Sequence, residues 1–251
     1  MENILEILRL GLCIKYYPDS TLHIMISFFA VFLAGYLLGS LNFGVIISKV
    51  FYHDDIRKHG SGGAGATNMQ RTYGNFPAAV TFLGDGLKAA AAVLIGALLL
   101  GHNSVYAGSY IGGMASIIGH CFPVYYKFKG GKGVASTFFM VLCTSPLTGL
   151  ICFAIFIIIV AGTKFISLGS VMAVLIYPLI LNRITGPGLH NLIAIFIALL
   201  IVYLHRANIK RLLNGGENKI NLKHRKKEKD DKYNGGNDGG SDSNGKEEEN
   251  D

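Results

Sequence analysis

A long region with a single carboxylate limits most strongly what this chain can fold into. From Ile56 to Gly216 the only acidic residue is Asp85, whereas lysines and arginines recur in short loops. A soluble domain covers its surface with charges of both signs and carries roughly 25% charged residues. Here charged residues make up 16% and apolar residues 51% of the chain. The sequence therefore predicts an all-α fold, a polytopic bundle of membrane helices.

Apolar segments of about membrane length recur along the chain, since a spanning helix needs ~20 apolar residues. The segment 134–163 is long for one pass, and we expect two short passes that turn near Ser145-Pro146. This gives about seven spans, which we place at 22–50, 76–100, 105–126, two within 134–163, 166–182 and 188–204.

The distribution of cations predicts the orientation of these spans. Most lysines and arginines fall in the loops 51–75 and 127–133 and in the block 205–229. Cytoplasmic loops are enriched in Lys and Arg, so we expect all three to be cytoplasmic and the N-terminus to lie outside. Arg183 is then the one exception.

The two ends of the chain differ from the middle. Residues 1–20 form an amphipathic, interfacial segment without the basic start or cleavage site of a signal peptide. Residues 21–217 form the membrane-embedded domain. Residues 218–251 form a charged, low-complexity tail that is too polar to bury a core, and we expect it to be disordered.

A glycine-rich loop at 56–71 is the first candidate for chemistry. Its glycines let backbone N–H groups converge, while Ser61, Thr67 and Asn68 add short hydrogen-bonding groups. With the flanking cations, including Arg71, the loop suits a phosphate.

Two nucleotide-binding motifs match this loop poorly. Gly60 to Gly65 matches G-x-G-x-x-G, but no strand precedes it, as a dinucleotide site requires. Ala66 stands where a Walker loop needs lysine. A small phosphorylated ligand is the better interpretation.

A second loop, 127–133, combines lysines with Gly130, Gly131 and Gly133. The loop could serve only to orient the protein, but three glycines are unnecessary for that, and they would let a backbone close on a phosphate. Two such loops on one side of the membrane predict one site for two phosphates or two facing sites.

Several polar groups near membrane helices have both a structural and a functional interpretation. Asp85 and Lys88 can share a helix face, as an internal ion pair or as part of a site. The same two alternatives apply to His120, to Ser170 and to the small polar patch 39–44. The segment at His205 and Asn208 could be only a basic anchor, although these two residues are more specific than an anchor needs.

Five ordered motifs resemble the bacterial PlsY family of acyl-phosphate:glycerol-3-phosphate acyltransferases. They are Gly39-Ser40-x-x-Phe43-Gly44, Gly60-Ser61-Gly62-x-x-Gly65-Ala66-Thr67-Asn68-x-x-Arg71, Gly119-His120-x-x-Pro123, Phe128 to Ala135, and His205-Arg206-x-Asn208-Ile209-x-Arg211-Leu212-Leu213. The likeness covers about residues 30–217. It implies transfer of an acyl group from acyl phosphate to the sn-1 hydroxyl of glycerol 3-phosphate, giving lysophosphatidic acid and phosphate, the first step of phospholipid synthesis.

The resemblance also implies roles for individual residues. Catalytic roles fall on Ser61, Arg71, Lys132, His205 and Asn208. Together with the composition of the two loops, the resemblance leads us to expect phosphate binding at Ser61, Gly62, Gly63, Gly65, Thr67, Asn68, Arg71, Lys129, Gly131, Lys132 and Ser170. The chain departs from the family at Gly63, where Asn is usual, and at Asn42, where Pro is frequent.

No cofactor, metal or nucleic acid is expected. The implied partners are the two substrates, the lipid bilayer and a cytoplasmic enzyme that produces acyl phosphate. The implied location is the bacterial plasma membrane, with the active site at its cytoplasmic face.

The expected reaction needs no covalent intermediate, because acyl phosphate is already activated. None of the eight histidines is followed five residues later by aspartate, which excludes the mechanism of the soluble-donor acyltransferases. The base is either a side chain such as His205 or a phosphate oxygen of a substrate. A membrane transporter of a phosphorylated small molecule is the main alternative, and a purely structural membrane protein is a third.

Overall fold

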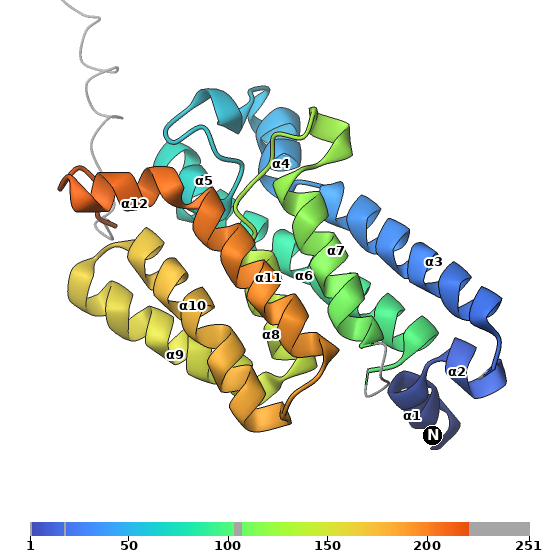
Figure 1. Ribbon diagram of the computed structural model, residues 1–251. Coiled ribbons are helices and arrows are strands. Elements are labelled where there is room, and N and C mark those ends of the chain that lie inside the picture. The colour runs from blue at the N-terminus through green and yellow to red at the C-terminus, as the bar shows by residue number, and fades with distance from the viewer. Residues whose placement is uncertain (1, 18, 103–106, 221–251) are drawn as a thin grey trace, which may run out of the picture. The chain divides into compact units, whose positions relative to one another are not determined.

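The computed structural model describes residues 2–17, 19–102 and 107–220, and every regular element within these ranges is a helix (Figure 1). The elements are α1 (Glu2–Leu10), α2 (Leu12–Tyr16), α3 (Thr21–Ser40), α4 (Phe43–Tyr52), η1 (Ile56–Lys58), α5 (Ala66–Tyr73), α6 (Asn75–Leu100), α7 (Gly108–Cys121), η2 (Val124–Tyr126), α8 (Val134–Thr144), α9 (Pro146–Thr163), α10 (Ile166–Thr185), α11 (Leu189–Leu204) and α12 (Arg206–Leu213). The predicted all-α class is confirmed.

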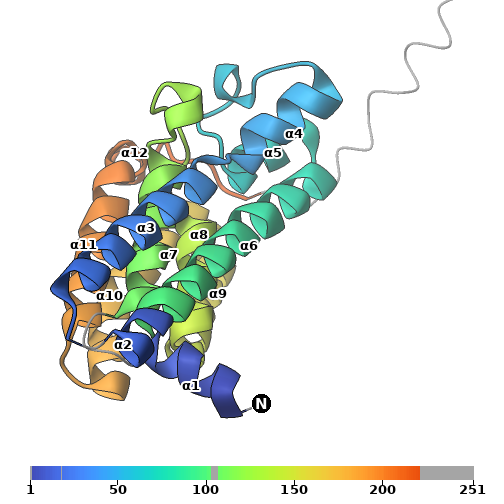
Figure 2. The ribbon, with the colours of Figure 1, turned by 90° about the vertical axis from the view of Figure 1, so that its right-hand side faces the viewer.

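Small residues bring the central helices close together. Helix α7 packs against α3 and α6 (Figure 2). A Cβ added at Gly39 of α3 would lie 2.1 Å from the carbonyl oxygen of Ser116 in α7. Small residues at helix interfaces allow such close backbone approach, which is the usual basis of packing between membrane helices.

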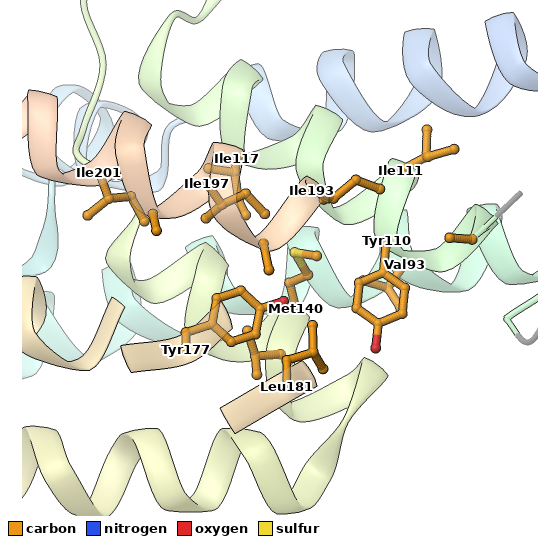
Figure 3. Packing of buried hydrophobic residues seen from close by; sticks show 14 of the residues in the cluster. Val93, Tyr110, Ile111, Ile117, Met140, Tyr177, Leu181, Ile193, Ile197 and Ile201 are labelled. Carbon is orange, nitrogen blue, oxygen red and sulfur yellow. The ribbon is translucent and has the colours of Figure 1, made fainter. Parts of the chain in front are cut away.

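The main hydrophobic core lies between α7, α8, α10 and α11. Figure 3 shows Ile117, Met140, Tyr177 and Ile197 packed together there, and all four are almost completely buried. The outward faces are also apolar: Phe29 is 69% exposed and Leu179 71% exposed. Apolar side chains on both the inner and outer surfaces are what a bundle surrounded by lipid requires.

The segment 134–163 is divided as predicted, because α8 ends at Thr144 and α9 begins at Pro146. Proline suits the first position of a helix, where its missing N–H costs nothing. Four of the described segments are long and apolar enough to cross a membrane, with α3 and α4 counted as one, or five if α11 and α12 form one bent span. The number seven remains a prediction.

The loops 51–75 and 127–133 and the described part of the block 205–229, up to residue 220, lie at the same end of the bundle, as predicted. Figures 1 and 2 show α4, α5, α12 and the segment between α7 and α8 together there, with α1 and α2 at the opposite end. The compact unit spans Met1–Lys219. It includes α1 and α2, which pack on α6, and the interfacial role of residues 1–20 remains a prediction. The predicted disordered tail lies almost entirely outside the described residues.

Candidate active site

A polar cavity of about 260 Å³ lies where the two glycine loops meet the end of α11 and the start of α12. Most of the predicted site residues line it. They are Ser61, Gly63, Gly65, Thr67, Asn68, Arg71, Gly131, Lys132, Ser170, His205 and Asn208. Gly62 and Lys129 are not part of this lining in the described chain, and Lys129 is exposed.

The side chain of Asn68 shapes the first loop from within. Its Oδ1 accepts the Ser61 N–H at 3.0 Å, and its Nδ2 donates to the carbonyl oxygens of His59 and Gly63 at 2.9 and 2.8 Å. Gly60 has φ +55, and a Cβ there would lie 2.3 Å from Asn68 Oδ1. The loop is therefore wrapped tightly around a buried amide, and Asn68 fixes the shape of the loop backbone.

Two helix N-termini face the same cavity. Gly65 precedes α5 and Gly133 precedes α8, and no side chain among the described residues caps either end. The first residues of both helices, Ala66 and Val134, line the cavity. Uncapped N–H groups and the helix dipole favour anions, so each N-terminus is suited to a phosphate.

Lys132 is held by a network of hydrogen bonds in the lining of the cavity. Its ammonium donates to Asn208 Oδ1, and Asn208 Nδ2 donates to Glu217 Oε1 at 2.7 Å. Burial lowers the pKa of Lys132 to about 8; the carboxylate of Glu217 opposes this shift, and the charges of Arg211 and Arg71 add to it. The lysine is thus a cation whose charge is sensitive to its surroundings.

Glu217 is a site residue that sequence reasoning missed. Its carboxylate accepts from Asn208, from Ser167 Oγ at 2.8 Å and from Arg211 Nε at 2.7 Å. Burial raises its pKa, but these hydrogen bonds outweigh burial and keep the pKa below its usual value. One signal could have identified it: Glu217 is the first acid after Asp85.

His205 presents one defined nitrogen to the cavity. Its Nδ1 lies 2.8 Å from the carbonyl oxygen of Ile201, which can only accept. Nδ1 must therefore carry the proton, and in the neutral ring Nε2 is the basic nitrogen.

Arg57 connects the two loops. Asp55 accepts from Arg57 Nε at 2.9 Å and from Nη2 at 2.6 Å, which fixes the guanidinium and holds the Asp55 pKa at about 2. The remaining nitrogen, Nη1, donates to the carbonyl oxygens of Tyr126 and Lys129 at 3.1 and 3.3 Å. Arg57, one of the cations flanking the glycines of the first loop, thus ties that loop to the second.

The structure shows the contacts of the polar groups for which the sequence left both a structural and a functional interpretation open. Asp85 and Lys88 form a buried ion pair of 2.7 Å, and Asp85 and His120 also line the cavity. Ser170 Oγ donates within α10 to the carbonyl oxygen of Ile166. In the described chain the small polar patch 39–44 lies outside the cavity lining and serves helix packing and the break between α3 and α4.

An apolar cavity of about 100 Å³ adjoins the polar one. The two share Phe82, Val134, Phe156 and Ser170 as lining residues. The apolar cavity continues between α8, α9 and α10 to Tyr177. A ligand with a phosphate at one end and a hydrocarbon chain at the other would find a matching surface for each end.

Comparison with known proteins finds similarity to one family. The family model described as glycerol-3-phosphate acyltransferase matches residues 29–215. A glycerol-3-phosphate acyltransferase of Clostridioides difficile (strain 630) is 42% identical over 201 residues, covering 78% of this chain and 97% of the relative. The enzyme of the same name from Syntrophotalea carbinolica is 40% identical over 196 residues, covering 78% and 99%.

Two solved structures are also similar. The glycerol 3-phosphate form of PlsY, an integral membrane glycerol 3-phosphate acyltransferase, matches with a TM-score of 0.73 at 37% identity, covering 78% of this chain and 96% of that one. The lysophosphatidic acid form of PlsY matches with a TM-score of 0.70 at 36% identity and the same coverage.

Proposed function

This chain belongs to the glycerol-3-phosphate acyltransferase family, as an integral membrane protein, and from that premise we propose its full reaction. An acyl group passes from acyl phosphate to the sn-1 hydroxyl of glycerol 3-phosphate, and the products are lysophosphatidic acid and inorganic phosphate. The relatives reported above are acyltransferases, so the transporter alternative has no support from them.

The observation that carries the proposal is the pair of uncapped helix N-termini, of α5 and α8, on one cavity. Both proposed substrates carry a phosphate, and the reaction requires both to be bound together. Arg71 and Lys132 add a cation from each loop. We assign one phosphate to the first loop and Arg71, and the other to Lys132 and the start of α8.

The adjoining apolar cavity supports a lipid-like acyl donor. Phe82 and Phe156 line both cavities, so a bound acyl phosphate would have its carbonyl group near the boundary between them. The hydrocarbon chain would then lie among the apolar side chains of α8, α9 and α10, where its burial is favourable.

The chemistry follows from these positions. The sn-1 hydroxyl oxygen attacks the acyl carbonyl carbon, an ester C–O bond forms, and the C–O bond to phosphate breaks. The hydroxyl proton ends on the released phosphate. His205 Nε2 can accept this proton in passing, or a substrate phosphate oxygen can take it directly. The cations and N–H groups stabilise the negative charge that develops on the carbonyl and phosphate oxygens.

The test is an assay in which purified protein is incubated with an acyl phosphate, with and without glycerol 3-phosphate. The release of phosphate and the formation of the lipid product are measured. We expect release that depends on glycerol 3-phosphate. Its absence would refute the proposal.

Variants assign the roles. Arg71→Ala and Lys132→Ala should each lower activity on the order of 10²-fold, the usual cost of removing one charge-stabilising donor, in protein that still inserts. The substrate whose KM rises in each variant identifies the loop that binds it. Full activity of His205→Ala would exclude His205 as the base and leave the substrate phosphate oxygen.

We further propose that the protein works in the bacterial plasma membrane with this cavity at the cytoplasmic face. The cationic loops at that end of the bundle support this orientation. A cytoplasmic enzyme that makes acyl phosphate would then reach the cavity from the same side.

A further inference from the structure

A buried cluster of three polar side chains lies between the two loops and the helices that carry them. Lys88 Nζ lies 2.7 Å from Asp85 Oδ1 and 3.0 Å from His120 Nδ1. The side chains of all three residues are at most 4% exposed. Charges buried this deeply are costly and need complete hydrogen bonding, so their remaining partners are informative.

The ion pair bonds to backbone at the break between α3 and α4. Lys88 Nζ donates to the carbonyl oxygen of Leu41 at 2.7 Å, and Asp85 Oδ1 accepts the Phe43 N–H at 3.3 Å. A broken helix leaves such groups without their usual partners, and the pair supplies them. Helix α4, fixed in this way, contacts the first loop, because a Cβ at Gly44 would lie 2.0 Å from the carbonyl oxygen of Ala64.

The histidine of the cluster supports the second loop. The carbonyl oxygen of His120 accepts the Gly131 N–H at 3.1 Å. A Cβ at Gly131 would lie only 2.1 Å from His120 Nε2, so the loop backbone rests directly on the imidazole ring. The next residue is Lys132. The start of α8 is fixed to the same place, since Ser136 Oγ donates to the carbonyl oxygen of Asp85 at 3.0 Å.

We propose that Asp85, Lys88 and His120 are positioning residues that hold the two phosphate loops in register, with the contact between His120 and Gly131 setting the place of Lys132. This rests on the proposed acyl transfer. The three side chains act through the backbone of the loops, and α6, which carries the ion pair, forms the common support.

A double-mutant cycle with His120→Ala and Gly131→Ala tests the contact. Each single variant should lower kcat at least tenfold: one removes the support, and the other pushes the loop off it. Because the alanine at 120 makes room for the added methyl, the double variant should be no slower than the slower single variant. Losses that multiply would overturn the proposal.

A pH profile separates positioning from general damage. The groups around Lys132 are Asn208, Glu217, Arg211, Arg71 and His205. In His120→Ala a loosened loop should expose the Lys132 ammonium and move the alkaline fall of kcat/KM to higher pH. A merely structural defect would reduce the active fraction and leave the profile unchanged, which would also overturn the proposal.

Controls keep the test decisive. His23→Ala removes an exposed histidine at the other end of α3, and its activity should match the unsubstituted protein. If His120→Ala does not fold, His120→Asn, whose shorter polar side chain also leaves the position of Nε2 empty, takes its place in the cycle and in the profile. If the unsubstituted protein releases no phosphate in response to glycerol 3-phosphate, the proposed function is refuted. If the unsubstituted protein is active and the His120 variant has the same kcat and the same pH profile, only the positioning role is refuted.

Discussion

Lys132 is a residue whose charge depends on its surroundings. Its pKa is lowered to about 8 by burial, so the ammonium is present below pH 8 and is lost as the pH rises through 8. If this cation holds a phosphate, kcat/KM should fall by about tenfold per pH unit above that point. Measuring kcat/KM, which reports the free enzyme, from pH 6 to 10 checks this expectation.

Matched variants identify the titrating group. Lys132→Arg should remove the alkaline fall, because arginine stays charged, although its different shape should reduce the maximum rate. Glu217→Gln should move the fall to lower pH, since the carboxylate raises the Lys132 pKa. Lys127→Arg, at an exposed position outside the cavity lining of the described chain, should leave the profile unchanged. An alkaline fall that persists in Lys132→Arg would assign it to another group.

At single positions the sequence predicted which residues line the cavity better than which groups those residues contact. Ser61, Arg71 and Lys132, which line the cavity, could be predicted because serine, arginine and lysine beside glycines suit phosphate wherever the chain folds. Asn68 and Glu217 differ, because their roles depend on which backbone and side-chain groups the fold brings to them. No spacing in the sequence indicates that α12 is followed by a return of the chain to the cavity.

The short element η1 shows how one side chain can couple two loops. Arg57, in η1, donates to the carbonyl oxygens of Tyr126, at the end of η2, and of Lys129, in the second loop, while Asp55 holds its guanidinium. Lysine at this position would keep the charge but could not make this set of directed bonds. We expect Arg57→Lys to raise KM several-fold with little change in thermal stability.

Lys58→Arg is the matched control for Arg57→Lys, because Lys58 is an exposed neighbour in the same element. Its KM should stay at the value of the unsubstituted protein. Equal effects of the two substitutions would show that net charge, and not the link between the loops, matters there.

The contact between α3 and α7 is tight enough for a single methyl group to test it. A Cβ at Gly39 would meet the backbone of Ser116 at 2.1 Å, whereas a Cβ at Gly162 of α9 would meet nothing within 4 Å. Gly39→Ala should therefore destabilise the protein by roughly 1–3 kcal/mol through overpacking. Gly162→Ala should leave the unfolding temperature in detergent unchanged or slightly higher. Equal unfolding temperatures of Gly39→Ala and Gly162→Ala would contradict so close an approach of α3 to α7.

For the whole molecule, the orientation of the bundle is the prediction to test. The sequence could predict that the cationic loops share one end, because charge sets orientation, but helix length alone supports only four or five spans. In a cysteine-free background, Lys127→Cys should react with a membrane-impermeant thiol reagent only when the cells are permeabilised and the reagent reaches the cytoplasmic side. Arg183→Cys, at the end of α10, should react in intact cells. Labelling of both from one side would exclude an odd number of crossings between them.

The two helix N-termini that face one cavity have a consequence for the direction of the reaction. Under the proposed chemistry, two phosphate groups are present before acyl transfer and two are present after it. A cavity that neutralises two anions would therefore meet the same number of phosphate groups in the substrates and in the products, and, like any catalyst, it would leave the equilibrium of the reaction unchanged. The thermodynamic drive must come from exchanging an anhydride for an ester, and turnover must depend on the lipid product dispersing into the bilayer.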